Sequence, residues 1–519
     1  MRSFLAILSL LLTYSLFAQG TLDASFGNGG LVLTNLGADD YVRKVVVRED
    51  GRVVAITESG AGSQNDLVLV QYNADGSLDT SFGNNGIAEI NLPEASVQIG
   101  EAILLDDGDI IVSGGNGFLS SSVEPFLARI NADGSLDASF GNGGIVIDNT
   151  FGVPPAQINA LALQNGNQLI AGINAPGGIF VVRYDVATGE RDNTFGTNGL
   201  ALFDAFPTAS IEKILIQADN KILMVGTRFE APNFTGVLKL RRFNSDGDGD
   251  LSYGDGSSSE IVVFAGGSRG VDATLLVDGG MLVVVNEDGL INRRAALTRI
   301  GTDGFQDLDF GSSGLVIFES TSGLDNADIQ AHAMSPLQNG AVLVAGTDGG
   351  PSASVAFLRR FSASGSPDPD FGQNGTVTTD FGVGMGFHNG SSIALSGSDK
   401  VVIGGFTFDG SEVDLGLARY SSGGMVPTES LGTMVEDWKI TPNPVANQAE
   451  VQGFLNQSGV FDLRVFDQKG ALVQTLWTGH YLAAGRFSQV LDFSNLSSGV
   501  YFIQLEGKMG QSLQTLVKK

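Results

Sequence analysis

The chain has 519 residues, including 72 glycines and no cysteine, and its formal net charge at pH 7 is −28. Without cysteine, disulfides and thiolate metal sites are excluded, so the stability of the fold has to come from packing. The negative charge disfavours nucleic acid and anionic membrane surfaces as partners, and it is typical of an exported protein that stays soluble. Abundant glycine without low hydrophobicity indicates tight turns between buried strands.

The first residues form a targeting signal. Arg2 precedes an apolar run from Phe4 to Phe17, which has the length of a signal peptide and is too short to span a bilayer. We expect cleavage after Ala18, so residues 1–18 are a signal peptide and take no part in the fold. No other long apolar run follows, and no transmembrane segment is expected in the mature chain.

A short box is then repeated along the chain, as in GSLDTSFGNNG (76–86) and GSLDASFGNGG (134–144). Successive boxes are separated by 56, 58, 55, 58, 57 and 61 residues, measured between their aromatic positions, and this spacing defines seven units within 19–424. The aromatic positions are Phe26, Phe82, Phe140, Phe195, Tyr253, Phe310 and Phe371.

Each unit contains the pattern of four short strands. Two of them form a hairpin around a polar turn, as in EAILLDDGDIIVSGG (101–115), and an alternating strand such as PFLARI (125–130) precedes the next box. The pattern predicts an all-β, seven-bladed β-propeller with four-stranded antiparallel blades. A parallel β-solenoid is the alternative, although its coils are shorter and rarely contain such hairpins. We expect LVLT (31–34) to pair with the seventh blade and close the ring.

The box itself indicates a structural corner. An aspartate stands three residues before each aromatic position, and short polar side chains of this kind hold turns by binding nearby backbone N–H groups. The strand before the box ends in a repeated polar residue, and we expect most of these residues to pair with a box aspartate. They are Gln71, Arg129, Arg183, Arg242, Arg299, Arg360 and Arg419. A ring of arginines binding an anionic ligand is the functional alternative.

These D-G-S-L-D-x-S-F-G-x-x-G boxes resemble the delta-60 repeat family, over roughly residues 20–425. The resemblance implies a β-propeller-like fold in an exported bacterial protein, and it implies no reaction. The match is close in the first boxes. It is looser at Tyr253, where serines replace the glycine turn, and at Asp309 and Asp370, which replace a serine.

The composition changes after the last unit. Residues 425–437 are polar and predict a linker, and 438–519 contain alternating strands separated by Asn, Gly and Ser turns, which predict a small β-sandwich domain. Pro442-Asn443-Pro444, VFDQKG (465–470), SSGVYFIQL (497–505) and the basic end resemble the C-terminal sorting domain of the type IX (Por) secretion system of Bacteroidetes. The resemblance implies that the secretion machinery handles 438–519, and that the protein reaches the outer cell surface or is secreted.

One stretch resembles a calcium-binding loop, NSDGDGDLSYGD at 244–255. Alternating oxygen ligands, a glycine at the sharp turn and a distal carboxylate suit a hard cation. The candidate ligands of a structural Ca²⁺ are Asn244, Asp246, Asp248, Asp250 and Asp255. The same residues also form an ordinary box, and a loop without bound metal is the competing interpretation.

No catalytic constellation is evident. The histidines, His332, His388 and His480, are scattered without metal-ligand spacing, and no nucleophile elbow or phosphate-binding loop occurs. We therefore expect a non-enzymatic binding or adhesion scaffold for an extracellular polysaccharide or protein. A propeller enzyme that acts on polysaccharide, and a structural protein of the cell surface, are the alternatives.

Overall fold

The structure is a computed structural model of the whole chain, and contacts divide it into two compact units that separate after Gly424. The predicted signal peptide lies outside the described residues. The described residues form strands and turns and contain no helix, and so none that could cross a membrane. The described residues are 19–519 without 62–63, 95, 118–122, 149–155, 207, 231–234, 277, 290–291, 323–326, 338–339, 351–352, 382–386, 398, 409, 423–434, 456–458, 467–471, 483–484 and 508–509.

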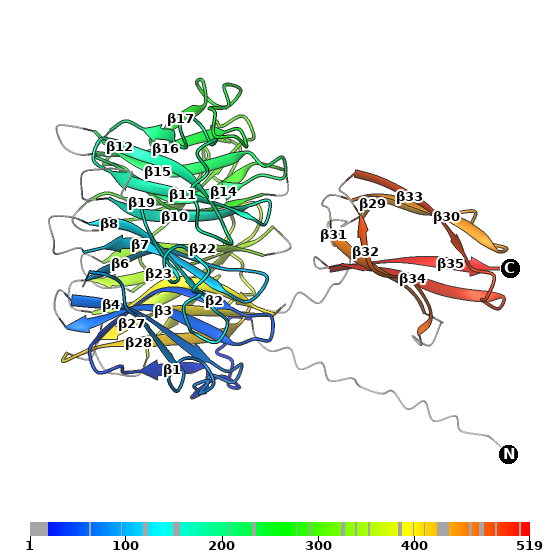
Figure 1. The fold of residues 1–519 in the computed structure, drawn as a ribbon, viewed down its shortest axis with the longest axis horizontal. Coiled ribbons are helices and arrows are strands. Elements are labelled where there is room, and N and C mark those ends of the chain that lie inside the picture. Colours follow the sequence, from blue (N-terminus) through cyan, green and yellow to red (C-terminus); the bar gives the residue numbers. More distant parts are fainter. Residues whose placement is uncertain are drawn as a thin grey trace, which may run out of the picture. The chain divides into compact units, whose positions relative to one another are not determined.

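The first unit contains seven antiparallel blades of four strands, which confirms the predicted propeller (Figure 1). Blades 1 to 3 comprise β2 (Asp39–Val47), β3 (Val53–Ala61), β4 (Gln64–Tyr72), β5 (Ile87–Ile90); β6 (Val97–Leu104), β7 (Ile110–Asn116), β8 (Glu124–Ile130), β9 (Ile145–Ile147); and β10 (Gln157–Gln164), β11 (Gln168–Ala175), β12 (Gly178–Asp185), β13 (Ala201–Asp204). Blades 4 and 5 comprise β14 (Ala209–Ile216), β15 (Ile222–Glu230), β16 (Thr235–Phe243), β17 (Ser258–Ile261); and β18 (Ser268–Leu275), β19 (Met281–Glu287), β20 (Ala295–Ile300), β21 (Leu315–Phe318). Blades 6 and 7 comprise β22 (Asp328–Pro336), β23 (Val342–Gly350), β24 (Ala353–Phe361), β25 (Thr376–Thr379); and β26 (Phe387–Ser396), β27 (Lys400–Phe408), β28 (Val413–Ser421) and β1 (Leu31–Thr34).

The N-terminal strand closes the ring. β1 pairs antiparallel with β28, with Leu31 opposite Ala418 and Thr34 opposite Leu415, so the seventh blade takes its outer strand from the other end of the propeller sequence. Figure 1 shows the blue β1 beside the yellow β28. The predicted closure by residues 31–34 is confirmed.

The first strand of each blade is the innermost one. β2, β6, β10, β14, β18, β22 and β26 contact one another in a closed ring around the axis. Seven clusters of buried apolar side chains fill the seven seams between neighbouring blades. The aromatic peg of each box lies in the cluster between its own blade and the next one, for example Phe82 between blades 1 and 2. The hydrophobic core is therefore a ring of seams, and no single blade could bury its own faces.

The second unit is a two-sheet sandwich. One sheet has the order β29 (Val435–Thr441), β30 (Gln448–Leu455), β33 (Gly485–Asp492), and the other has the order β32 (Leu472–Leu482), β31 (Gly459–Phe466), β34 (Gly499–Gly507), β35 (Gly510–Lys518). Its core includes both tryptophans, Trp438 and Trp477. β29 begins at Val435, so the strand includes three residues that the sequence assigns to the linker. Two of them, Val435 and Glu436, lie opposite Leu455 and Phe454 of β30.

Candidate functional site

The repeated box is a turn held by its own side chains. In blade 1, Asp79 accepts hydrogen bonds from the backbone N–H and the hydroxyl of Ser81, at 3.1 and 2.6 Å. The next residue, Phe82, is 1 % exposed. Gly83 follows with a φ of 53°, and a Cβ there would lie 2.3 Å from the carbonyl oxygen of Ile87, so glycine is required. The box is therefore a structural corner with an aromatic peg.

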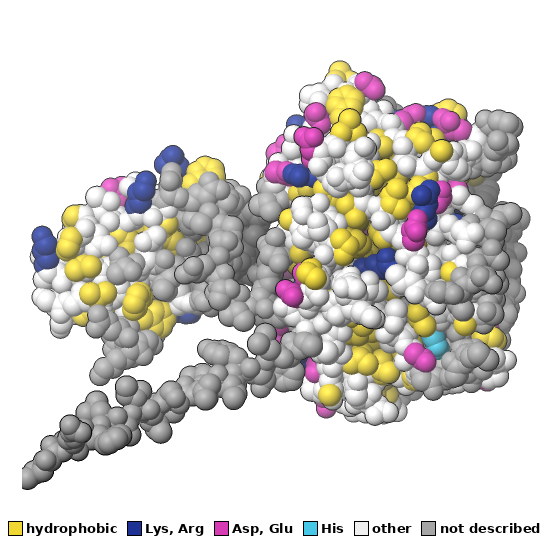
Figure 2. All heavy atoms as spheres, turned by 180° about the vertical axis from the view of Figure 1, so that it is seen from behind, with side chains coloured by type: hydrophobic (Ala, Val, Ile, Leu, Met, Phe, Trp, Pro, Cys, Tyr) yellow, Lys and Arg dark blue, Asp and Glu magenta, His cyan; other side chains and the backbone are white. Residues whose placement is uncertain are grey.

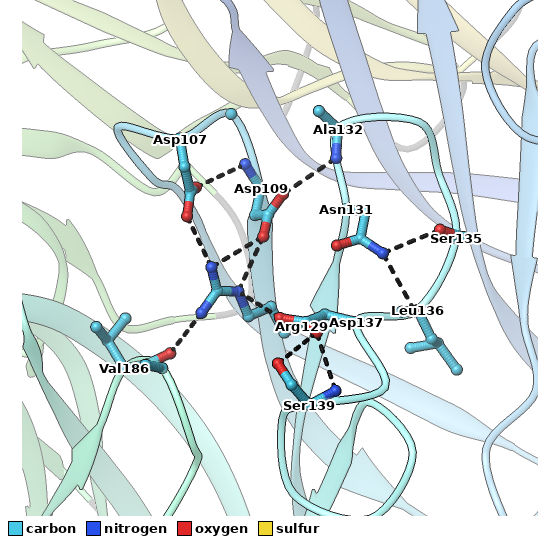
Figure 3. Close-up of polar contacts among 12 residues, drawn as sticks. Asp107, Asp109, Arg129, Asn131, Ala132, Ser135, Leu136, Asp137, Ser139 and Val186 are labelled. Carbon is cyan, nitrogen blue, oxygen red and sulfur yellow. Dashed lines mark hydrogen bonds and ion pairs between the residues drawn. The ribbon is translucent and has the colours of Figure 1, made fainter.

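The arginine that precedes each box pairs with the box aspartate, as the sequence predicts. In Figure 3, Arg129 lies among Asp107, Asp109 and Asp137, and its guanidinium donates a 3.1 Å hydrogen bond to the carbonyl of Val186 in the next blade. In blade 1, Gln71 takes the place of arginine and donates to Asp79 at 2.7 Å. The shortest N–O distances of the pairs are 3.2 Å for Arg129–Asp137, 2.6 Å for Arg183–Asp192, 2.8 Å for Arg242–Asp250, 3.6 Å for Arg299–Asp307, 2.8 Å for Arg360–Asp368 and 2.8 Å for Arg419–Asp23.

These pairs leave the two faces of the propeller unequal. The first and third strands of a blade end on the same face, so the boxes lie beside the turns that join first and second strands. In blade 2 the N–H of Ala132, two residues before a box, donates to Asp109 in such a turn, at 3.1 Å. We call this side the box face, and it is occupied by repeated contacts between blades. The opposite side, which we call the loop face, carries the connections between second and third strands and between successive blades.

A bulge interrupts every innermost strand at the same level. The register of the first strand shifts at this level in all seven blades, for example between Val42 and Lys44 and between Ile211 and Lys213. A bulge re-aims side chains and often occurs next to functional sites. The residues at this level are Lys44, Glu101, Ala160, Lys213, Asp272, Ala333 and Ser392. In blade 2 the register resumes only at Ala102, so Glu101 lies within the bulge.

Four of these residues form an ionic belt across the channel, made of Lys44, Glu101, Lys213 and Asp272. Glu101 lies 2.9 Å from Lys44 and 3.8 Å from Lys213, and Lys213 lies 3.1 Å from Asp272. Blades 2 and 4 are not neighbours, so Glu101 and Lys213 meet across the channel in front of the small Ala160. Burial opposes the ionisation of Glu101, but the charges of Lys44 and Lys213 outweigh burial and hold the pKa of Glu101 below its ordinary value. The charge of Asp272 raises the pKa of Lys213.

The belt separates two different halves of the channel. The positions toward the box face are apolar: Val47, Leu104, Leu163, Ile216, Leu275, Pro336 and Leu395. The first five of these also pack against the seam clusters. The two positions of each blade toward the loop face are polar except for Gly100 and Val271. We call the polar ones the polar mouth: Tyr41, Arg43, Gln98, Gln157, Asn159, Ser210, Glu212, Arg269, Gln330, His332, Asn389 and Ser391. All of the side chains of the polar mouth are partly or fully accessible to solvent.

Three titratable groups of the polar mouth have shifted pKa values, and burial raises that of Tyr41. Burial raises the pKa of Glu212 to about 7, although hydrogen bonds from Ser210 at 2.6 Å and Thr227 at 3.3 Å favour its ionised form. Burial lowers the pKa of His332 to about 4, so its imidazole is neutral at pH 7, and its Nε2 lies 3.1 Å from the Thr347 hydroxyl. Glu212 could donate or accept a proton near neutral pH. Sequence reasoning did not identify it, because a single glutamate in one repeat carries no local signal.

The predicted calcium ligands lie on the box face of blade 4. Asp250 contacts Arg242 at 2.8 Å and Lys221 at 3.1 Å, and it is the box aspartate of its blade. Asp246 accepts a hydrogen bond from the N–H of Asp248 at 3.1 Å, and the N–H of Asn244 donates to the carbonyl of Asp248, whereas the N–H of Asp255 donates to Ser258. In the part of the chain that the structure describes, no three acidic or histidine side chains form a group that could hold a metal ion. Calcium binding at 244–255 stays a prediction.

Comparison with known protein families supports both units. Residues 439–519 match the secretion system C-terminal sorting domain, and residues 48–82, 105–140 and 217–253 match a β-propeller domain of unknown function. The sorting domain indicates export through type IX secretion, to the cell surface or into the medium. Each of the three propeller segments ends at the aromatic residue of a box. The search of curated proteins found no match.

Solved structures resemble the chain at the level of the fold alone. A protein of unknown function from Dyadobacter fermentans is 12 % identical, with a TM-score of 0.42, over 76 % of this chain and 99 % of that one. A polysaccharide lyase, the ulvan lyase of family PL25, is 9 % identical, with a TM-score of 0.45, over 76 % and 96 % of the two chains. The extracellular domains of Drosophila Semaphorin 1b are 9 % identical, with a TM-score of 0.38, over 78 % and 88 %.

Proposed function

We propose that this protein is a non-enzymatic β-propeller that works outside the cell as a binding or adhesion scaffold for a polysaccharide or protein, and that it binds its partner at the polar mouth. The observation that carries the proposal is the contrast between the two ends of the channel. Side chains on the box face serve the same contacts in each repeat, whereas the pair of residues that a blade contributes at the polar mouth is different in each blade. Variation of side chains on a rigid scaffold is typical of a binding surface.

The charges of the channel support binding over catalysis. The acids of the ionic belt, Glu101 and Asp272, are both paired with lysines, so neither is available as a general acid or base. On the face drawn in Figure 2, acidic and basic side chains of the propeller are scattered among neutral and apolar ones, without a patch of a single charge. A ligand that uses many neutral hydrogen bonds fits such a surface better than a highly charged polymer.

A binding screen tests this proposal. The chain without residues 1–18 is applied to an array of extracellular polysaccharides, with calcium and then with chelator. We expect retention on at least one glycan or protein ligand, with weaker binding after Asn159→Ala or Ser391→Ala in the polar mouth. Asn142→Ala on the box face is the matched control and leaves binding unchanged. Equal effects of all three substitutions would contradict a site at the polar mouth.

Glu212 favours a second candidate function, an enzyme that acts on extracellular polysaccharide. A carboxyl group with a pKa of about 7 suits a general acid, and cleavage of a glycosidic bond normally needs a second carboxylate nearby. Each polysaccharide that binds should therefore be incubated with the protein and assayed for new chain ends. Turnover that disappears in Glu212→Gln would replace the binding proposal, whereas binding without turnover supports it.

A further inference from the structure

A polar groove lies on the outer wall of the propeller, at the seam between blades 5 and 6. Its volume is about 610 Å³, within the range of about 300–1,000 Å³ that is usual for small-ligand sites. One wall is the segment that leaves β21, and the other consists of β24 and the outer strand β25. The groove is lined by Thr321, Ser322, Asp348, Ala353, Ser354, Val355, Gln373, Asn374, Thr376 and Thr378.

Polar residues at both of the seam-facing positions of the outer segment occur in blades 4 and 6, and blade 6 differs from blade 4 in carrying no charge there. The outer segment of each blade begins at the residue directly after its box. Its first and third residues lie on the side that faces the preceding blade, as Ile145 and Ile147 do at the seam between blades 1 and 2. At most seams both residues are apolar. Blade 6 alone has threonine at both positions, Thr376 and Thr378. The corresponding pairs elsewhere are Ile87 and Glu89, Ile145 and Ile147, Leu200 and Leu202, Ser258 and Glu260, Leu315 and Ile317, and Leu31 and Leu33. Ile87, Ile145, Leu200, Leu315 and Leu31 pack against the seam clusters of their blades.

The wall opposite the threonines is anchored by a buried carboxylate. Asp348 is 1 % exposed and accepts hydrogen bonds from the N–H and the hydroxyl of Thr321, at 2.9 and 3.0 Å, and from the hydroxyl of Ser320. Arg359 lies 3.7 Å from Asp348 and donates to the carbonyl of Glu319 at 3.0 Å. These contacts fix the segment and neutralise the buried charge, so the groove is preformed, which lowers the entropy cost of binding.

The side chains along the groove offer neutral hydrogen-bonding groups. Thr376, Thr378, Gln373 and Asn374 provide hydroxyl and amide groups, and these four side chains make no hydrogen bond to any residue that the structure describes. Hydroxyl groups both donate and accept, as do carboxamides, which matches the hydroxyl groups of a sugar. No lysine or arginine lines the groove, and the net charge of −28 disfavours an anionic ligand.

We propose that this groove binds a neutral oligosaccharide. An extended peptide added to the free edge of β25 is the competing ligand, but every blade has a free outer edge, so edge pairing does not account for threonines at this seam alone. The groove is separate from the polar mouth. It supplies a second binding site on the scaffold, and its existence does not depend on what the polar mouth binds.

The test measures affinity for neutral oligosaccharides in the chain without residues 1–18. Gluco-, manno-, xylo- and galacto-oligosaccharides of four to six sugars serve as probes in calorimetric titrations. We expect at least one of them to bind, and the double variant Thr376→Val/Thr378→Val to bind about tenfold more weakly, because two hydrogen bonds are lost. Valine is favoured in strands, so the variant should fold, and an unchanged melting temperature verifies this.

Three controls make the result decisive. Thr80→Val applies the same change to an exposed threonine on the box face and should leave affinity unchanged. Gln373→Ala, a second groove variant outside the strand, should also weaken binding. If an oligosaccharide binds equally well to the double variant but more weakly to Asn159→Ala, the polar mouth is its site and the groove inference is wrong while the proposed function stands. The groove inference is also wrong if no probe binds, or if only an extended peptide does.

Discussion

The repeated arginine–aspartate pair allows one change to be made in two settings within the same molecule. In blade 4, Arg242 and Asp250 are 2.8 Å apart and the side chain of each is 9 % exposed. In blade 5, Arg299 and Asp307 are 3.6 Å apart and about a third exposed, at 32 % and 30 %. Asp250→Asn and Asp307→Asn remove the same charge from the same position of the repeat. Asparagine keeps the Oδ1 acceptor for the turn, so the substitution isolates the charge.

The expected costs differ because of burial. Removing one partner of a buried pair leaves the other charge without compensation and costs about 3–5 kcal/mol, whereas an exposed pair contributes less than about 1 kcal/mol. Lys221, 3.1 Å from Asp250, is a second cation that would lose this contact in blade 4, although it keeps Asp219 at 3.5 Å. We therefore expect Asp250→Asn to destabilise the propeller by several kcal/mol and Asp307→Asn to change its stability little.

Urea denaturation followed by circular dichroism measures the propeller. Both tryptophans lie in the C-terminal unit, so their fluorescence reports that unit separately and serves as an internal control. Equal losses of stability in the two variants would refute the reasoning, because they would mean that the turn, and not the burial of the charge, determines the energy.

The same pair predicts a pH dependence. Burial opposes the ionisation of Asp250, but its hydrogen bonds to Ser252 and Lys221 and the charge of Arg242 hold its pKa below the ordinary 3.8. A carboxyl group with a lowered pKa in the folded state stabilises the fold above its unfolded pKa, and this contribution is lost as the pH falls. The difference between the wild type and Asp250→Asn should be complete at pH 7 and shrink below about pH 4. A difference that persists unchanged at pH 2 would contradict this assignment.

Three further predictions concern the closure of the ring, Glu212 and the loop at 244–255. Deleting residues 19–34 removes β1 and the Phe26 peg, so limited proteolysis should cut the propeller rapidly, whereas deleting 435–519 should leave its melting temperature unchanged. Glu212 has a raised pKa, so its protonated form stabilises the fold at low pH and that stability is lost as the pH rises through about 7. Unfolding curves at pH 5 and pH 8 should therefore show that Glu212→Gln gains stability relative to the wild type at the higher pH. If the difference in stability between the two proteins is the same at both pH values, burial is not the cause of the shift. If 244–255 binds calcium, the metal should raise the melting temperature and Asp246→Asn/Asp248→Asn should abolish the shift, whereas identical melting with calcium and with chelator would rule out a stabilising ion.

Much of the architecture could be predicted because the information is local and repeated. Each box contains its own turn, an aromatic peg and a glycine at positive φ, so seven boxes at regular spacing specify seven blades. The pairing of Arg419 with Asp23, which joins the two ends of the propeller, was also predictable, since it occupies the same place in the repeat as Arg129 with Asp137. The start of β29 at Val435 could not be predicted, because acidic residues beside a polar linker give no strand signal of their own.

The sequence alone determined the fold class, the number of blades, the closure of the ring and the route of export, since each depends on a pattern contained within one repeat or one terminal domain. The tertiary structure alone decided which side chains meet. Lys44, Glu101, Lys213 and Asp272 come from four blades and meet only because the innermost strands lie side by side in the ring. The groove beside Thr376 and Thr378 likewise exists only where two blades pack. Contacts between repeats depend on the three-dimensional ring, and no single repeat encodes them.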